Sequence, residues 1–183
     1  MRARQLPLIL VIGVLLLAGC LPQPAEDPVE PDPSSAPVFA SEEEALAAAV
    51  AAYEDYLKVS DAIAADGGAN PERLQEVAAG ALVDQEVAGF EEFAAEGFRS
   101  TGRTVILNPV LQQWEANPVE GQESIWMYLC SDVSAVDVIN SDGVSVVSPD
   151  RPSRVSLQVG LALEANRLLV SSKDVWTSDD ICG

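Results

Sequence analysis

Residues 124–139 read SIWMYLCSDVSAVDVI, and this stretch carries the longest β-strand signal of the chain. Its first part, Ile125 to Leu129, is apolar at consecutive positions, which is typical of a strand that is covered on both faces. Valine and isoleucine recur through the second part, up to Ile139, and β-branched residues favour extended backbone. The sequence therefore predicts one long, central strand over residues 124–139.

Three more strands are expected around this one. Val155 to Leu163 alternates apolar and polar residues, which predicts a strand buried on one face. The other two expected strands are 103–114, disturbed at Asn108-Pro109, and 167–176. Asp142-Gly143 and Ala165-Asn166 are turn signals, and short connections between strands favour antiparallel pairing. We expect a mainly four-stranded antiparallel sheet in which successive strands are neighbours.

The chain before the strands has helical periodicity. Ser41 and Glu44 form a capping-box pattern that opens a long helix ending near Ala65. Asn70-Pro71 predicts a second start, with Asn70 as the cap, and a third helical stretch covers residues 83–96 before Gly97. Helices followed by strands predict an α+β fold in two layers, with residues 41–183 as one domain.

This order of elements resembles the nuclear transport factor two-like superfamily, whose members have a cone-shaped (cystatin-like) fold. The resemblance covers the long first helix, the shorter helical pair and the long strands, up to Cys182. The domain is also similar to small exported lipoproteins of actinobacteria that are assigned to that superfamily. The resemblance implies helices packed on a curved sheet. The superfamily includes isomerases and dehydratases that use a buried aspartate with tyrosine or histidine partners.

The N-terminus has the features of an export signal. Arg2 and Arg4 precede an apolar run that is too short to span a bilayer as a helix. The next four residues, Leu17-Ala18-Gly19-Cys20, resemble the lipobox of bacterial lipoproteins, in which the cysteine receives the lipid. We expect residues 1–19 to be a lipoprotein signal peptide and Cys20 to be lipidated; an ordinary secretory signal with a chance cysteine is the alternative.

Residues 20–40 are expected to form a tether between the lipid and the domain. Six prolines and several acidic residues occur here, and such segments bury too little apolar surface to fold. This organisation predicts a protein anchored to the outer, extracytoplasmic face of the cell membrane through its lipid.

The composition excludes several classes of function. The chain has 29 acidic and 10 basic residues, no histidine and a formal net charge of −19. This charge repels nucleic acid phosphates, so no nucleic acid partner is expected. The absence of histidine removes Ser-His-Asp and Cys-His catalysis and most zinc sites. No phosphate-binding or dinucleotide motif is present, and we expect no cofactor and no metal.

Cys130 and Cys182 remain after Cys20 is assigned to the lipid. Two cysteines in an oxidising compartment are most simply explained by a disulfide. Zinc binding is the alternative, although two cysteines without histidine do not fill a tetrahedral site. This disulfide would hold the C-terminus against the strand that contains Cys130.

The expected function is a non-enzymatic binding or scaffolding module, with a homodimer or an envelope protein as partner through an apolar sheet face. The alternative is a binder of a small apolar molecule, in a pocket on the concave side of the sheet. An isomerase-like or dehydratase-like enzyme is less favoured; its candidates would be Tyr53, Tyr56 and Asp132, with Trp114, Trp126 and Tyr128 around them. Aromatic residues at these spacings also fit a filled core. The candidate pocket residues are Tyr53, Phe90, Trp114, Trp126 and Tyr128.

The lipid anchor is testable by one substitution. Cys20→Ala removes the sulfur that accepts the lipid, so the protein is expected to move from the membrane fraction to the soluble fraction in cell fractionation. Cys182→Ser is the control, because it also removes a cysteine but leaves the lipobox intact. Retention of the Cys20→Ala protein in the membrane fraction would contradict the lipobox interpretation.

Overall fold

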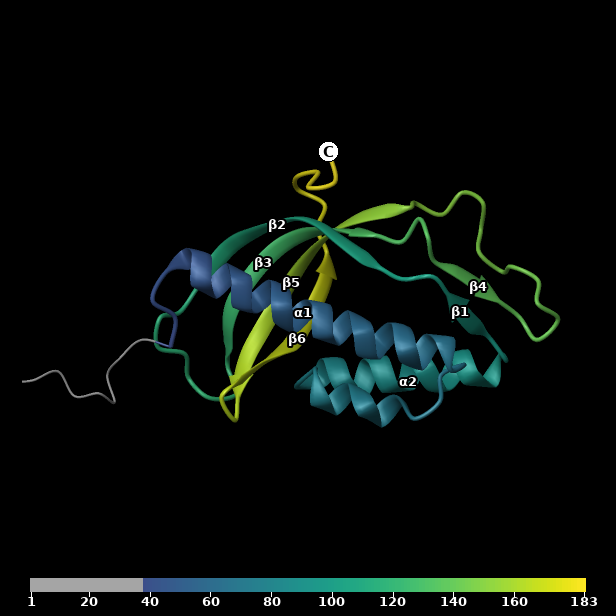
Figure 1. The fold of residues 1–183 in the computed structure, drawn as a ribbon, viewed down its shortest axis with the longest axis horizontal. Helices are drawn as coiled ribbons and strands as arrows, with labels where there is room; N and C mark the ends of the chain where they lie inside the picture. The colour runs from purple at the N-terminus through teal and green to yellow at the C-terminus, as the bar shows by residue number, and fades with distance from the viewer. Residues whose placement is uncertain (1–37) are drawn as a thin grey trace, which may run out of the picture. The chain divides into compact units, whose positions relative to one another are not determined.

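The computed structural model describes residues 38–183. The expected signal peptide, the lipidation site Cys20 and most of the expected tether (21–37) lie outside the described residues. Within the described part, three helical elements come first and six strands follow (Figure 1).

Helix α1 (Glu42–Ala65) begins and ends with the signals read from the sequence. The Ser41 hydroxyl oxygen accepts a hydrogen bond from the backbone N–H of Glu44, and the Glu44 carboxylate accepts one from the N–H of Ala40. The capping box therefore forms, with its reciprocal bond displaced by one residue. At the other end, Gly67 and Gly68 have positive φ angles and donate to carbonyls of the last turn, which is a Schellman motif.

Two shorter helices follow. The element η2 (Pro71–Glu76) is a 3₁₀ helix, and Asn70 precedes it in the left-handed conformation without a side-chain cap bond. The prediction that the Asn70 side chain caps this helix is wrong, because a capping residue needs an extended backbone and Asn70 is left-handed. Helix α2 (Ala81–Ala95) is followed by Gly97, whose N–H donates to the Ala94 carbonyl, as expected of a glycine just after a helix C-terminus.

The main sheet has the order β2-β3-β5-β6, with every neighbouring pair antiparallel. Its strands are β2 (Val105–Trp114), β3 (Glu123–Asp132), β5 (Arg154–Glu164) and β6 (Arg167–Val175). The prediction of an α+β fold with a four-stranded antiparallel sheet is confirmed, and the arrangement is consistent with the cone-shaped fold. In Figure 1 the strands curve and α1 crosses one side of them.

The prediction of a single strand over residues 124–139 is wrong in one respect: this stretch forms two strands, which belong to two different sheets. After β3 the chain turns at residues 133–136, where the Asp132 carboxylate accepts a bond from the N–H of Ser134. Arg151 holds this turn by donating to the carbonyls of Val133 and Val136. Strand β4 (Asp137–Ile139) then pairs with the short β1 (Arg99–Thr101), which was not expected from the sequence.

The hydrophobic core lies between α1 and one face of the sheet. Tyr53, Tyr56 and Ile63 of α1 are fully buried there. Alternate residues of the central strands face them: Ile125, Met127, Leu129, Val159 and Leu161. Large side chains from both layers fill the space that a cone-shaped fold encloses.

Strand β5 is buried on both faces over residues 159–163, whereas one buried face was expected. The reason lies at Gly160, which faces away from α1. A Cβ atom at this glycine would lie 2.4 Å from the Ser172 hydroxyl and 2.7 Å from the Glu123 carboxylate. Because Gly160 and Ala162 on this face are small, the polar side chains of Glu123 and Ser172 lie directly over the strand here.

The C-terminal tail lies on the face of the sheet that is opposite α1. A disulfide joins Cys130 of β3 to Cys182, 52 residues later. The Ser156 hydroxyl accepts the N–H of Ile181, and the Asn108 amide donates to the Ile181 carbonyl. The tail therefore covers the buried Cys130 and closes this part of the outer face.

Within residues 38–183, none of the helices has the length and hydropathy needed to cross a bilayer.

The disulfide is expected to stabilise the fold. Closing a loop of 52 residues contributes about 4 kcal/mol in the chain-entropy model. Reduction of the purified protein is therefore expected to lower its melting temperature. Dithiothreitol should leave a Cys130→Ser, Cys182→Ser double variant unchanged, which provides the control. Two free thiols in the oxidised, folded protein would contradict the pairing.

Candidate functional site

The five expected pocket residues lie in four different places. Tyr53 is in the core and stacks on Tyr56. Phe90 is half-buried on α2, and Trp114 packs edge-on against Phe39 at the end of β2. Trp126 and Tyr128 alternate with the core residues of β3, so they lie on the outer face of the sheet.

The structure thus does not bring these five side chains into one cavity. On the outer face, the Trp126 indole donates to Glu123, and the Tyr128 ring packs against Trp176 at 4.5 Å between centroids. On the inner face, the core side chains occupy the centre of the concave sheet.

Asp132 was the carboxylate considered as a base in the enzyme interpretation. Hydrogen bonds from Ser134, together with Arg154, lower the pKa of Asp132 to about 2. The Arg154 Nε atom lies 2.7 Å from the carboxylate. A base that works near neutral pH needs a raised pKa, so the local contacts of Asp132 act in the opposite direction.

A polar cluster of Tyr56, Lys173 and Glu86 connects three elements inside the molecule. The Lys173 ammonium donates to the Tyr56 hydroxyl at 2.9 Å and to the Glu86 carboxylate at 2.8 Å. Burial raises the pKa of both Tyr53 and Tyr56 far above the usual range, and Glu86 adds to the effect at Tyr56. The tyrosines therefore stay protonated, and the cluster ties α2 and β6 to α1.

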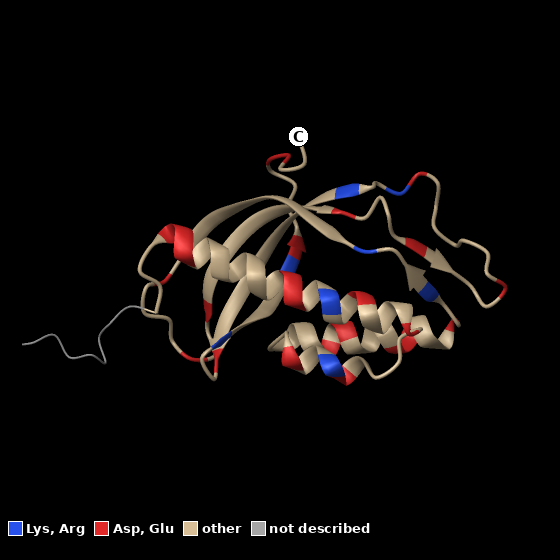
Figure 2. Cartoon of the chain, viewed as in Figure 1, with Lys and Arg blue, Asp and Glu red and all other residues tan. Residues whose placement is uncertain are grey.

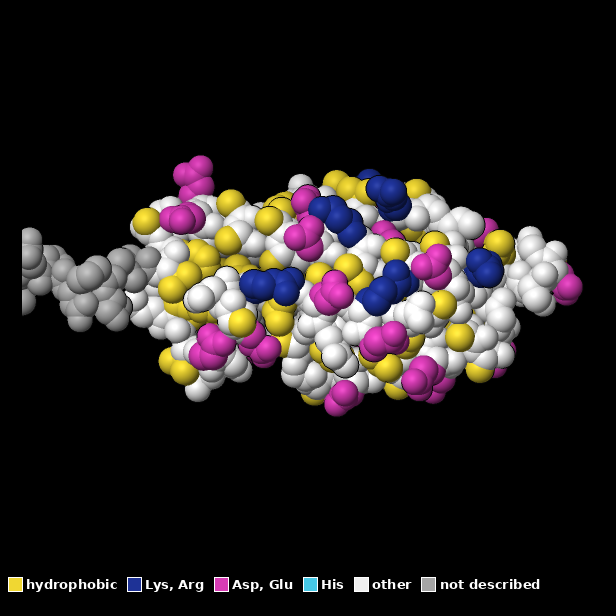
Figure 3. Space-filling model, turned by 60° about the horizontal axis from the view of Figure 1, so that its bottom comes forward, with side chains coloured by type: hydrophobic (Ala, Val, Ile, Leu, Met, Phe, Trp, Pro, Cys, Tyr) yellow, Lys and Arg dark blue, Asp and Glu magenta, His cyan; other side chains and the backbone are white. Residues whose placement is uncertain are grey.

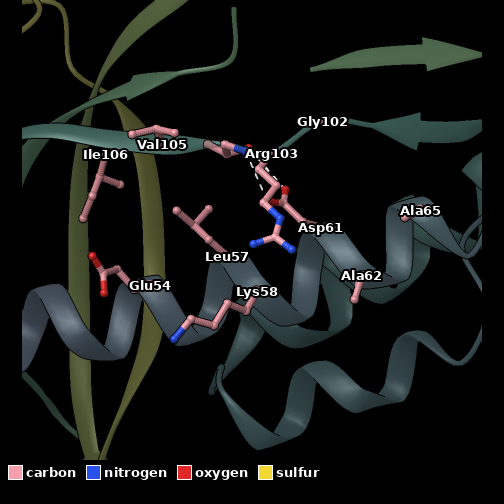
Figure 4. Close-up of a pocket in the computed structure, with 11 residues that line it drawn as sticks. Glu54, Leu57, Lys58, Asp61, Ala62, Ala65, Gly102, Arg103, Val105 and Ile106 are labelled. Atoms are coloured by element: carbon pink, nitrogen blue, oxygen red, sulfur yellow. Dashed lines mark hydrogen bonds between the residues drawn. The ribbon is translucent and has the colours of Figure 1, made fainter. Parts of the chain in front are cut away.

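A groove with a volume of about 670 Å³ lies between α1 and the beginning of β2 (Figure 4). This volume falls in the range that small ligands occupy in proteins. The apolar part of the lining comes from both elements: Leu57, Ala62, Ala65, Val105 and Ile106. The charged part consists of Glu54, Lys58, Asp61 and Arg103.

The charged residues of the groove differ in their partners. Asp61 accepts hydrogen bonds from the backbone N–H and the hydroxyl of Thr104, at 3.1 and 3.3 Å. Lys58 pairs with Asp55 on the same helix. Within residues 38–183, neither Glu54 nor Arg103 has an ion pair or a side-chain hydrogen bond. Arg103 is notable because the protein has few cations, as the charge distribution in Figure 2 shows.

Gly102 fixes the position of Arg103. Its φ angle is +81°, and a Cβ atom at this position would lie 1.9 Å from the carbonyl oxygen of Ala135. Only glycine allows the chain to pass so close to the turn between β3 and β4. The corner between β1 and β2 is therefore fixed, and the next residue is presented to the groove.

A second groove, of about 410 Å³, lies between the first half of α1 and the hairpin of β5 and β6. Its lining is mostly apolar and includes Phe39, Ala48, Val77, Leu163 and Leu168. Arg167 also lines it, but its guanidinium already donates to the Glu76 carbonyl. Figure 3 shows hydrophobic side chains gathered toward one end of the face in view, with acidic and basic ones scattered over the rest.

The α1–β2 groove was not predicted from the sequence. Glu54, Leu57 and Asp61 have the spacing of one helix face, which is a usable signal. Arg103 belonged to an expected strand, and nothing in the sequence says that its strand starts beside this helix face.

Comparisons with known proteins give the fold and no family. The sequence matches no protein-family model and no protein of curated function. The structure is similar to the intermembrane space region of the chloroplast protein ARC6, with a TM-score of 0.52 and 12% identity over 73% of this chain and 97% of that chain. Aln2 from a Streptomyces species matches with a TM-score of 0.45 and 14% identity, over 75% of this chain and 92% of that chain.

The close approach at Gly102 gives a matched pair of substitutions. Gly143 also has a positive φ angle, but a Cβ atom there meets nothing within 4 Å. Gly143→Ala should cost only the left-handed strain, about 1–2 kcal/mol. Gly102→Ala should cost about 1–3 kcal/mol more, because the backbone must move. Equal losses in chemical unfolding would contradict the close approach.

Proposed function

We propose that this chain is a membrane-anchored, extracytoplasmic lipoprotein whose folded part is a non-enzymatic binding module. Its ligand site is the groove between α1 and β2. The observation that carries the proposal is the composition of this groove: a largely apolar lining and the guanidinium of Arg103, which pairs with no side chain among residues 38–183. Binding sites for small molecules typically combine a mostly apolar lining with a few placed polar groups.

The anchor and the location belong to the same proposal. The lipobox, the proline-rich tether and the Cys130–Cys182 disulfide each suit a protein outside the cytoplasm. Membership of the nuclear transport factor two-like superfamily is also proposed, on the resemblance of the architecture.

Binding is favoured over catalysis by the state of the titratable groups. The residues considered for an isomerase-like site do not act as a unit, since Tyr53 and Tyr56 are in the core while Asp132 pairs with Arg154 at the start of β5. In the groove, Asp61 already accepts two hydrogen bonds from Thr104. These contacts leave the groove suited to holding a molecule rather than transferring a proton.

A protein partner is the second candidate, and β2 favours it. This strand is at the edge of the main sheet, and two of its valines, Val105 and Val110, are 52% and 50% exposed. An exposed apolar edge can pair with another chain. Asn108-Pro109 interrupts the regular pairing of β2 with β3, and such irregularities restrict edge pairing to short segments.

Native mass spectrometry tests the proposal on the full-length protein, purified in detergent from its own host. The expected result is a reproducible small adduct that is lost on unfolding. Arg103→Glu should remove the adduct, because it reverses the charge at the groove. Arg167→Glu is the matched control: Arg167, at the start of β6, lies outside this groove and should leave the adduct in place.

Two results would count against the proposed site. An adduct that survives Arg103→Glu would place the ligand elsewhere. A bare chain that purifies only as a dimer or with a second protein would favour the partner at β2.

A further inference from the structure

The α1–β2 groove has charges of opposite sign at two places along its length. In Figure 4 the Glu54 carboxylate lies at one end of the groove beside Ile106, and the Arg103 guanidinium lies farther along α1 beside Asp61, with Ala62 and Ala65 beyond it. Leu57 projects between the two charges toward β2. The stretch from Glu54 to Arg103 therefore has an acidic end, an apolar middle and a basic end.

The other two charged residues of the groove already have partners. The Asp61 carboxylate keeps its negative charge, but its oxygens accept hydrogen bonds from Thr104. The Lys58 side chain runs away from β2 in Figure 4, and its ammonium lies 2.8 Å from Asp55. Within residues 38–183, Glu54 and Arg103 are the charged residues of the groove without a side-chain partner, so their hydrogen-bonding groups are free for a ligand.

The separation of the two ends follows from helix geometry. Glu54 and Asp61 are seven positions apart on α1, which corresponds to about 10 Å along the helix axis. A ligand that reaches both ends must therefore have an extended middle of several carbon atoms. Leu57 and Ile106 are half-buried, so they offer that middle an apolar surface.

We infer that the groove binds a zwitterion: a molecule with an ammonium group at one end, an apolar chain in the middle and a carboxylate at the other. The ammonium pairs with Glu54, and the carboxylate accepts the fork of hydrogen bonds that a guanidinium offers. The inference rests on the proposed function and names the class of ligand for the same groove.

The charge of the whole protein favours this class over the two simpler ones. With a net charge of −19, the protein repels a plain anion at long range. A plain cation is attracted but leaves Arg103 without a partner. A zwitterion has no net charge to repel and satisfies both ends.

Three probes of the same length test the inference on the full-length protein in detergent. Aminocaproate carries both charges, caproate carries only the carboxylate, and hexylammonium carries only the ammonium. Isothermal titration calorimetry is expected to show aminocaproate binding about fivefold more tightly than either single-charge probe, the effect of one exposed ion pair.

Two neutralising variants assign the ends. Glu54→Gln should make aminocaproate bind no better than caproate, and Arg103→Gln should make it bind no better than hexylammonium. The matched controls are Glu43→Gln, in the first turn of α1, and Arg167→Gln, at the start of β6, which should preserve the preference for aminocaproate.

Three results would overturn the inference: caproate or hexylammonium binding as tightly as aminocaproate, a preference that survives both neutralising variants, or no binding of any probe. None of these would overturn the proposed function, which depends on whether the purified protein carries an adduct that Arg103→Glu removes.

Discussion

The packing of α1 against the concave face of the sheet is the contact on which the rest of the structure depends. Tyr53, Tyr56 and Ile63 enter this interface from the helix, and Met127 and Val159 meet them from the two central strands. Burial of side chains of this size stabilises a fold by about 1.5–3 kcal/mol each. The same packing fills the interior, and the groove of the proposed site lies at the edge of the interface, where α1 passes the start of β2.

Secondary contacts hold the remaining parts to this interface. Lys173 joins β6 to α1 and α2 through Tyr56 and Glu86, which matters because Leu82 is the one buried residue of α2. On the opposite face of the sheet, the disulfide holds the C-terminal tail. Gly102 sets the corner that brings Arg103 beside α1. These contacts hold both α1 and the start of β2 in place. The distance between Glu54 and Arg103 along the groove is therefore fixed.

Local patterns predicted the fold, while contacts between distant segments determined the site. Ser41 with Glu44, the glycines after each α-helix and the alternation in β5 were sufficient for the helices and for the antiparallel sheet. The sequence did not show that residues 124–139 divide at 133–136, because the bend depends on Arg151 reaching back to this turn. Nor did the sequence show that Trp126 and Tyr128 lie on the opposite face of the sheet from Tyr53. Residues at consecutive positions of a strand point to opposite faces, and where both positions are apolar the pattern does not show which face meets α1.

The proposed ligand site lies at the edge between α1 and β2, while core side chains fill the interior. A backbone amide NMR titration of the protein with aminocaproate distinguishes these two places. The chemical-shift changes are expected to cluster at residues 54–61 and 102–106. Changes centred on the core residues Met127, Leu129 and Val159 of the central strands would mean that the interior opens to hold the ligand, and would contradict binding at the edge.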